Sequence, residues 1–271
     1  YRPFTKKYLY YGDKLVDYRR HYYKNMYEDK NMIATLGVGA KRDFSALAMN
    51  VIPDSGMMDG RTQVYLNYNY EDSGILDQGK ISNITRKVIK NFNISEEDVH
   101  YYVYGVLNSA PYINKYKNEL KKDFPHIPLL KDKEKYIEIG RRLYNLHLNY
   151  ENQPSWSGVE LVISNSNPSY RVTKMKHPKK GVLDTIIYNE NITITNIPEK
   201  AYEYVVNGRP AIEWIIDQYR IKTDKKSGIT DDPNEFSDNP KYILNLLLSV
   251  ITVSMKTLKL IEELPEFELI D

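Results

Sequence analysis

The 271-residue sequence predicts an α+β fold, with a mixed-sheet N-terminal part, helical support and a mainly helical C-terminal end. Strand patterns fill residues 1–80 and return over 151–197, whereas helical spacing fills 81–150 and 198–271. Strands and helices segregated along the chain in this way are typical of α+β folds. No period of roughly 20 to 50 residues repeats, which excludes a solenoid. We expect the four sections to form one domain of a larger chain.

The first section contains three apolar runs. Met32–Val38 and Phe44–Ile52 are short, and Pro53–Gly60 carries the turn residues of a loop. A third run alternates apolar and polar side chains, which indicates one half-buried strand. Its faces are Val64, Leu66, Tyr68 and Tyr70 on one side and Gln63, Tyr65, Asn67 and Asn69 on the other.

Three helices are predicted in the second section. Ser95 stands directly before three acids, which is a capping signal, and helical spacing follows it to Leu107. Pro111 fits the first turn of a second helix, which we expect to end near Lys122. The third helix is predicted over Asp132–Asn149, and together the three supply the helical support.

The third section returns to strands and the fourth to helices. Val159–Ile163 is a strand run, and Thr185–Tyr188 and Ile192–Ile194 flank a turn, which predicts a hairpin. From Pro198 onward helical faces dominate, ending in one long apolar helix. The polar stretch Thr223–Asn239 before that helix is predicted to be a long loop.

Composition excludes several classes of protein. The chain has no cysteine, so a disulfide framework, a Cys-ligated zinc site and a thiol nucleophile are ruled out. No apolar run matches the roughly 20 residues of a membrane helix, because polar residues interrupt the longest one, Tyr242–Leu260. The sequence begins with Tyr and not Met, so we expect a piece of a longer chain.

Tyrosine is the unusual feature, with 25 residues against 6 Phe and 2 Trp. A tyrosine ring packs while its hydroxyl forms a hydrogen bond, so both core and contact roles are open. Nine tyrosines on helix faces or in family-like segments are expected to pack with a bonded hydroxyl: Tyr101, Tyr102, Tyr104, Tyr112, Tyr136, Tyr188, Tyr202, Tyr204 and Tyr219. Another four lie beside basic or amide-bearing segments: Tyr65, Tyr68, Tyr70 and Tyr170.

No catalytic or metal site is predicted. The five histidines are spread along the chain, and no HExxH motif or phosphate-binding glycine loop occurs. Gly37 and Gly39 form a lone GxG, which we interpret as a turn with close backbone approach. Asn167–Tyr170 resembles the Asn-Pro-Pro-Tyr loop of amino-methyltransferases, which grips a flipped base, but Ser169 replaces the second proline. An Asn-Pro turn is the preferred interpretation, and a stand-alone base-modifying enzyme the less favoured one.

Local charge points to a polyanionic partner although the net charge is only +2. Residues 161–180 carry five bases and no acid, which suggests contact with DNA phosphates, or else a solvated loop. These phosphate candidates are Arg171, Lys174, Lys176, Lys179 and Lys180. A second polar set combines a glycine-flanked loop with one strand face, and such side chains can read base edges. These base-reading candidates are Lys41, Arg42, Arg61, Gln63, Tyr65, Asn67 and Asn69; an ordinary polar sheet face is the alternative.

Longer motifs, in order along the chain, carry a family resemblance. They are Tyr1–Tyr11, Tyr101–Tyr112, Leu120–Leu129, Gly140–Leu148, Ile186–Trp214 and Gln218–Asn234. In them the chain resembles the specificity region of single-chain restriction–modification enzymes, the type ISP subgroup in particular, and is also similar to type IIG specificity regions. Residues 31–75 match least, as expected if they read a target that is unique to each enzyme.

The resemblance implies a C-terminal target-recognition domain that binds double-stranded DNA. Section 1–80 is then the β-rich DNA-reading part, 81–150 the helical support, 151–197 the β-rich basic segment and 198–271 the helical C-terminal part. The parent enzyme is expected to act in the bacterial cytoplasm, away from membranes. Its methyltransferase and helicase-like ATPase domains are partners, and it uses S-adenosylmethionine, ATP and Mg²⁺, while this fragment itself needs no cofactor. The alternative is a docking scaffold between those domains, formed by the apolar faces of 97–149 and 208–262.

Overall fold

The computed structural model describes residues 2–12, 14–16, 26, 31–58, 61–71 and 79–270. His21, Gly60 and the first residue of the N-terminal motif lie outside this part of the chain. The backbone forms two compact units. Unit 1 comprises 8–148 and 260–271 together with residue 1, and unit 2 comprises 2–7 and 149–259.

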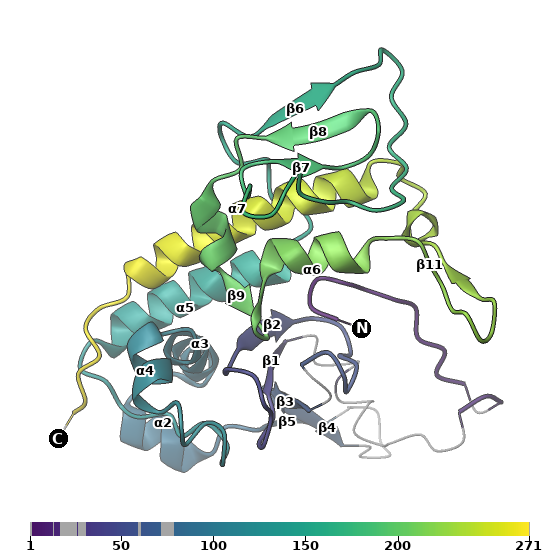
Figure 1. The fold of residues 1–271 in the computed structure, drawn as a ribbon. Coiled ribbons are helices and arrows are strands. Elements are labelled where there is room, and N and C mark those ends of the chain that lie inside the picture. Colours follow the sequence, from purple (N-terminus) through teal and green to yellow (C-terminus); the bar gives the residue numbers. More distant parts are fainter. Residues whose placement is uncertain are drawn as a thin grey trace. The chain divides into compact units, whose positions relative to one another are not determined.

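Unit 1 contains an antiparallel three-stranded sheet in the order β2-β1-β3 (Figure 1). The central strand β1 is buried along its whole length, as expected for an apolar run with a partner on both sides. Its Ile33 pairs with Ala48 of β2 and with Tyr65 of β3. The strands are β1 (Met32–Leu36), β2 (Ala46–Met49) and β3 (Thr62–Leu66).

The predicted single strand over 63–70 is wrong, because the chain bends at Asn67. β4 (Tyr68–Glu71) leaves the first sheet and pairs instead with β5 (Gly79–Ser82). Asn83 stabilises the bend, since its backbone N–H donates to the Asn67 carbonyl at 2.9 Å and its side chain donates to the Leu66 carbonyl at 2.9 Å.

One helix of unit 1 begins at its predicted cap, whereas the helix over Arg86–Phe92 was not predicted. The Ser95 hydroxyl accepts from the Asp98 N–H, so α3 begins where the capping signal predicted. The second predicted helix is shorter than expected, because it ends at Lys115 and turns replace it up to Lys122. The helices of unit 1 that the structure bounds are α2 (Arg86–Phe92), α3 (Glu96–Leu107), α4 (Ala110–Lys115) and α5 (Lys133–Leu148).

Tyrosines fill much of the core, and their hydroxyls bind backbone groups. Tyr102 donates to the Pro128 carbonyl at 2.6 Å and accepts from the Leu130 N–H at 2.9 Å. Tyr104 accepts from the Ala48 N–H at 2.9 Å. Six of the tyrosines expected to pack are almost fully buried, namely Tyr102, Tyr104, Tyr112, Tyr136, Tyr188 and Tyr219.

Unit 2 is less helical than predicted. The expected hairpin over 185–194 forms, but the C-terminal section also contains two hairpins where a helix and a loop were predicted. One of these, β11–β12 (Lys222–Thr223 and Thr230–Asp231), overlaps the stretch expected to be a long polar loop. The elements are β6 (Glu160–Ile163), β7 (Ile186–Ile187), β8 (Ile192–Thr195), η1 (Glu199–Glu203), β9 (Val205–Val206), β10 (Arg209–Pro210), α6 (Ala211–Gln218), β11 (Lys222–Thr223), β12 (Thr230–Asp231), η2 (Pro233–Glu235) and α7 (Tyr242–Glu262).

By length and composition alone, helix α7 could cross a membrane. The sequence pattern predicted no membrane helix here, because polar residues interrupt the apolar run. In the structure, 67% of its apolar window is buried inside the protein, as in the core helix of a soluble fold. Its polar residues bind the preceding chain: Ser249 accepts from the Gln153 N–H at 2.7 Å, and Thr252 donates to the Pro154 carbonyl at 2.7 Å. α7 is therefore a core element.

Candidate nucleic-acid interface

The loop of residues 37–43 in unit 1, here called the glycine loop, is closed by Arg61. The Gly37 N–H donates to the Arg61 carbonyl at 2.5 Å, and the Arg61 guanidinium donates to the Val38 carbonyl at 3.0 Å. A Cβ at Gly37 would lie 2.3 Å from the Arg61 carbonyl oxygen, and Gly39 has φ of +76°. Both positions therefore require glycine. The interpretation of the GxG as a turn with close backbone approach is confirmed.

The glycine loop is also held at its far end. The Gly39 N–H donates to the Lys121 carbonyl at 2.9 Å. The Asp43 carboxylate pairs with the ammonium groups of Lys117 at 3.3 Å and Lys121 at 3.6 Å. Lys41 and Arg42 lie between these anchors and are exposed. The loop thus presents two cationic side chains on a backbone that is fixed on both sides.

The strand residues of the base-reading set are less available. Gln63, Tyr65, Asn67 and Asn69 are half-buried. They do not share one face, because Gln63 and Tyr65 lie on β3, Asn69 lies on β4 and Asn67 is the bend between them. Asn69 donates its side-chain N–H to Asn83. Tyr65 and Asn67 line an apolar cavity of about 730 Å³, and burial raises the pKa of Tyr65.

The basic segment of unit 2, residues 171–180, has an anchored backbone and exposed cations. Val172 and Met175 are buried. The backbone of Lys176 exchanges two hydrogen bonds with Ile187 on β7, at 3.1 and 2.8 Å. Four lysine side chains of this segment are exposed: Lys174, Lys176, Lys179 and Lys180.

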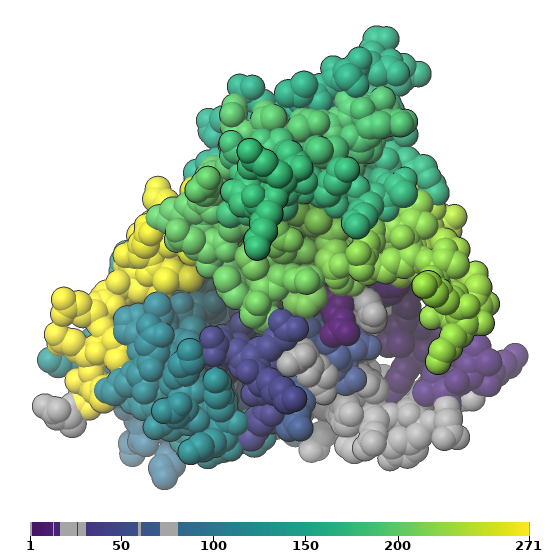
Figure 2. Space-filling model, in the orientation of Figure 1, coloured from purple at the N-terminus to yellow at the C-terminus, as the bar shows by residue number. Residues whose placement is uncertain are grey.

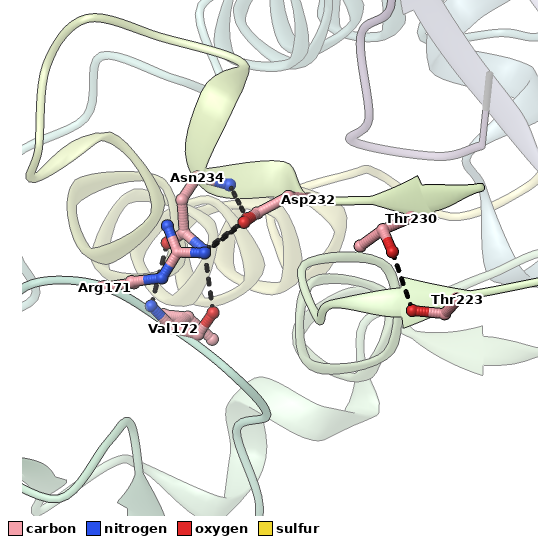
Figure 3. Close-up of polar contacts among 6 residues, drawn as sticks. All are labelled: Arg171, Val172, Thr223, Thr230, Asp232 and Asn234. Carbon is pink, nitrogen blue, oxygen red and sulfur yellow. Dashed lines mark hydrogen bonds and ion pairs between the residues drawn. The ribbon is translucent and has the colours of Figure 1, made fainter. Parts of the chain in front are cut away.

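Arg171 differs from these lysines because it pairs within the protein (Figure 3). Its guanidinium donates to Asp232, whose side chain is only 10% exposed and also accepts from the Asn234 amide at 2.7 Å. Burial opposes ionisation of Asp232, but the hydrogen bonds from Asn234 and Arg171 outweigh it and lower its pKa. Asn234 also binds both backbone groups of Val172, at 2.9 and 2.8 Å. Arg171 thus takes part in an internal brace, although half of its side chain stays exposed.

The segment Asn167–Tyr170 is bound to the neighbouring hairpin β7–β8. Asn189 donates to the Ser169 carbonyl at 2.7 Å, and Asn191 accepts from the Ser169 N–H at 3.3 Å. The Tyr170 ring lies under the Lys241 ammonium, with 4.9 Å between nitrogen and ring centroid. A bend over residues 165–167 stands where the Asn-Pro turn was predicted, and the Tyr170 side chain packs within unit 2.

Sequence reasoning missed the β11–β12 hairpin. The signal was present, because Asp224 and Gly228 are turn residues at the spacing of a short hairpin loop. Thr223 and Thr230 pair through their hydroxyls at 2.9 Å across the two strands (Figure 3). Within the described residues, no group of three or more His, Asp or Glu side chains is arranged to hold a metal ion.

Similarity to known proteins extends over nearly the whole chain. The sequence model of the type ISP C-terminal specificity domain matches residues 1–246. No curated protein matches the chain. A structure of a nuclease-deletion mutant of the type ISP restriction–modification enzyme LlaGI, in complex with a DNA substrate mimic, is 60% identical with a TM-score of 0.87, and the match covers 99% of this chain and 20% of that chain.

Two further structures are similar. The ATP-dependent type ISP restriction–modification enzyme LlaBIII bound to DNA is 57% identical with a TM-score of 0.91, over 99% of this chain and 18% of that chain. A DrdV–DNA complex is 24% identical with a TM-score of 0.84, over 99% and 28% respectively, and shares the fold. The chain spans about a fifth of the length of the type ISP enzymes it matches. With the family model covering 246 of its 271 residues, the chain belongs to the family of type ISP C-terminal specificity domains.

Proposed function

We propose that this chain recognises a short double-stranded DNA sequence as the specificity domain of a type ISP restriction–modification enzyme. Family membership carries the proposal. Its support is that LlaGI and LlaBIII, which are 60% and 57% identical over this region, were both solved with DNA or a DNA mimic bound.

The basic segment of unit 2 supplies the phosphate contacts. Its buried Val172 and Met175 fix the backbone, while four exposed lysines extend from it. Phosphate contacts position a protein on DNA without reading sequence, and lysine serves this purpose as a point charge. Arg171 acts mainly by bracing the segment against Asp232, and only its exposed part is left for DNA.

The glycine loop of unit 1 supplies the base contacts. Lys41 and Arg42 are exposed on a backbone that Arg61 and Lys121 hold in place, and a held backbone lowers the entropy lost on binding. Arg42 suits a guanine, because its guanidinium can donate two parallel hydrogen bonds. A supporting role at the edge of this reading surface falls to four half-buried residues: Gln63, Tyr65, Asn67 and Asn69.

In the parent enzyme the domain positions its target for the methyltransferase and for the ATP-dependent translocase and nuclease parts. The parent is an adenine methyltransferase and endonuclease of the bacterial cytoplasm that uses S-adenosylmethionine, ATP and Mg²⁺. This chain contributes recognition and no chemistry of its own.

Salt-dependent binding tests the phosphate contacts. K179A/K180A should weaken binding to duplexes of every sequence and lower the slope of log affinity against log salt by roughly 0.9 for each phosphate that the variant no longer neutralises. The matched control is K131A/K135A, which also removes two lysines, but these are paired with Glu268 and Glu138 in unit 1. If both double variants weaken DNA binding equally, the loss of net charge alone explains the result, and the assignment of phosphate contacts to this segment is contradicted.

Loss of one base preference tests the glycine loop. Methylation mapping in a host that expresses the full-length parent yields the target sequence. Arg42→Ala should then cost about 1–3 kcal/mol on the target duplex and relax one base position. If Arg42→Ala binds the target and its single-base variants in the same rank order as the original chain, the loop does not read that base.

A docking role is the second candidate, and strand β6 favours it. β6 is an edge strand whose Leu161, Val162 and Ile163 are 39%, 54% and 43% exposed. Exposed apolar edge strands usually mark a partner surface. The helices expected to dock have most of their apolar side chains buried in this structure. A chain that binds the parent's other domains but no duplex would favour this role.

A further inference from the structure

We propose that the tip of the β11–β12 hairpin, residues 224–229, makes a second contact with duplex DNA, in which Lys225 and Lys226 bind phosphates and Ile229 packs into a groove. The inference rests on the proposed function and extends it to a part of unit 2 outside the basic segment. The hairpin is the yellow-green projection in Figure 2.

Hydrogen bonds to Asp224 close the tip. The Asp224 carboxylate accepts from the backbone N–H groups of Lys226 at 3.0 Å and Ser227 at 2.8 Å. Gly228 takes the left-handed conformation with φ of +73°, and its N–H donates to the Asp224 carbonyl at 2.9 Å. The Asp224 N–H donates to the Ile229 carbonyl at 2.9 Å. A tip ordered before binding loses little entropy when it docks.

The base of the hairpin is tied to the rest of unit 2. Asp231 pairs with the Lys7 ammonium at 2.9 Å, and Asp232 pairs with Arg171. Asn234, two residues beyond, clamps the Val172 backbone (Figure 3). Because Arg171 and Val172 belong to the basic segment, the hairpin and that segment share one brace within unit 2.

Charge favours an anionic partner. Each carboxylate of the hairpin is already used: Asp224 by the turn, Asp231 by Lys7 and Asp232 by Arg171. Lys225 and Lys226 are exposed at the tip, and no ion pair with another described residue involves them. The tip keeps a net charge of +1, because Lys225 and Lys226 outnumber Asp224.

Ile229 distinguishes DNA from other anionic partners. Its side chain is 71% exposed, beside two lysines and no second large apolar residue in the turn. Protein interfaces are depleted in lysine at their core, so this composition does not suit a protein partner. Two-stranded ribbons enter DNA grooves, and single isoleucines insert or pack there between flanking phosphate contacts.

Protection of a single thiol tests the inference, because the chain has no cysteine of its own. In the full 271-residue chain, Ile229→Cys should react with maleimide several-fold more slowly once a random-sequence duplex is bound. The control is Val205→Cys, also in unit 2, at a position that is 48% exposed. Selective protection of the thiol at position 229 supports the contact, and unchanged reactivity of that thiol on bound duplex overturns it.

A second measurement separates the two proposals. K225A/K226A should lower the salt slope by roughly 0.9 for each phosphate contact, and Ile229→Ala should weaken affinity without changing that slope. If the original chain binds the duplex but these variants bind equally well, the hairpin contact is wrong and DNA recognition stands. If the original chain binds no duplex, both proposals fail.

Discussion

Replacing Gly140 with alanine tests how closely helices α3 and α5 approach in unit 1. A Cβ at position 140 would lie 2.0 Å from the Tyr101 carbonyl oxygen and 2.9 Å from the Gly105 nitrogen. Both are backbone atoms, so no side chain can rotate away. A Cβ on Gly105 would likewise lie 2.5 Å from the Tyr136 carbonyl oxygen. The two glycines permit this crossing.

The expected cost follows from these distances. An ordinary contact begins near 3.4 Å, so an alanine in place of Gly140 must move the helices apart by about 1.4 Å. Overpacking of this kind costs ~1–3 kcal/mol and occasionally more. Alanine also recovers about 1 kcal/mol of helix propensity over glycine. Because the clash is with rigid backbone, we expect a net loss of about 2 kcal/mol in the free energy of unfolding.

Urea unfolding followed by far-UV circular dichroism measures this loss. Lys135→Ala is the matched control, because Lys135 is an exposed residue of the same helix. It should change the free energy of unfolding by less than about 0.5 kcal/mol. A Gly140→Ala variant as stable as the original chain, or more stable, would refute the argument from close approach.

Three further predictions concern buried or half-buried polar groups. Tyr104→Phe removes the hydrogen bonds that the hydroxyl makes with His147 and the Ala48 N–H, and should cost about 2 kcal/mol or more in urea unfolding. Burial lowers the pKa of His100 to about 4 and that of His147 to about 3 in the folded chain. As the pH falls, these histidines therefore take up protons in the unfolded chain at a higher pH than in the folded chain. Stability should therefore fall as pH drops below about 6.5, by roughly 1.4 kcal/mol per unit for each histidine, and a flat profile down to about pH 5 would contradict this. Asn234→Ala removes both bonds to the Val172 backbone and should cost about 2 kcal/mol, with a smaller loss indicating that Arg171 alone holds the brace.

The sequence by itself determined the features that depend on neighbouring residues. Ser95 and the acids after it marked the start of α3, since a cap is made within one turn. The hairpin over 185–194 and the turn at Gly37–Gly39 were readable for the same reason. The α+β class, the family and the cationic character of 171–180 also followed from local patterns and motifs.

The tertiary structure decided which partner each local feature meets. Alternation over 63–70 could not reveal that Asn83 bends the chain at Asn67 and sends β4 to another sheet. Composition showed Arg171 as one of five bases, but only the fold brings Asp232 to it from 61 positions away. Such contacts arise between segments far apart in the chain, and no short-range pattern encodes them.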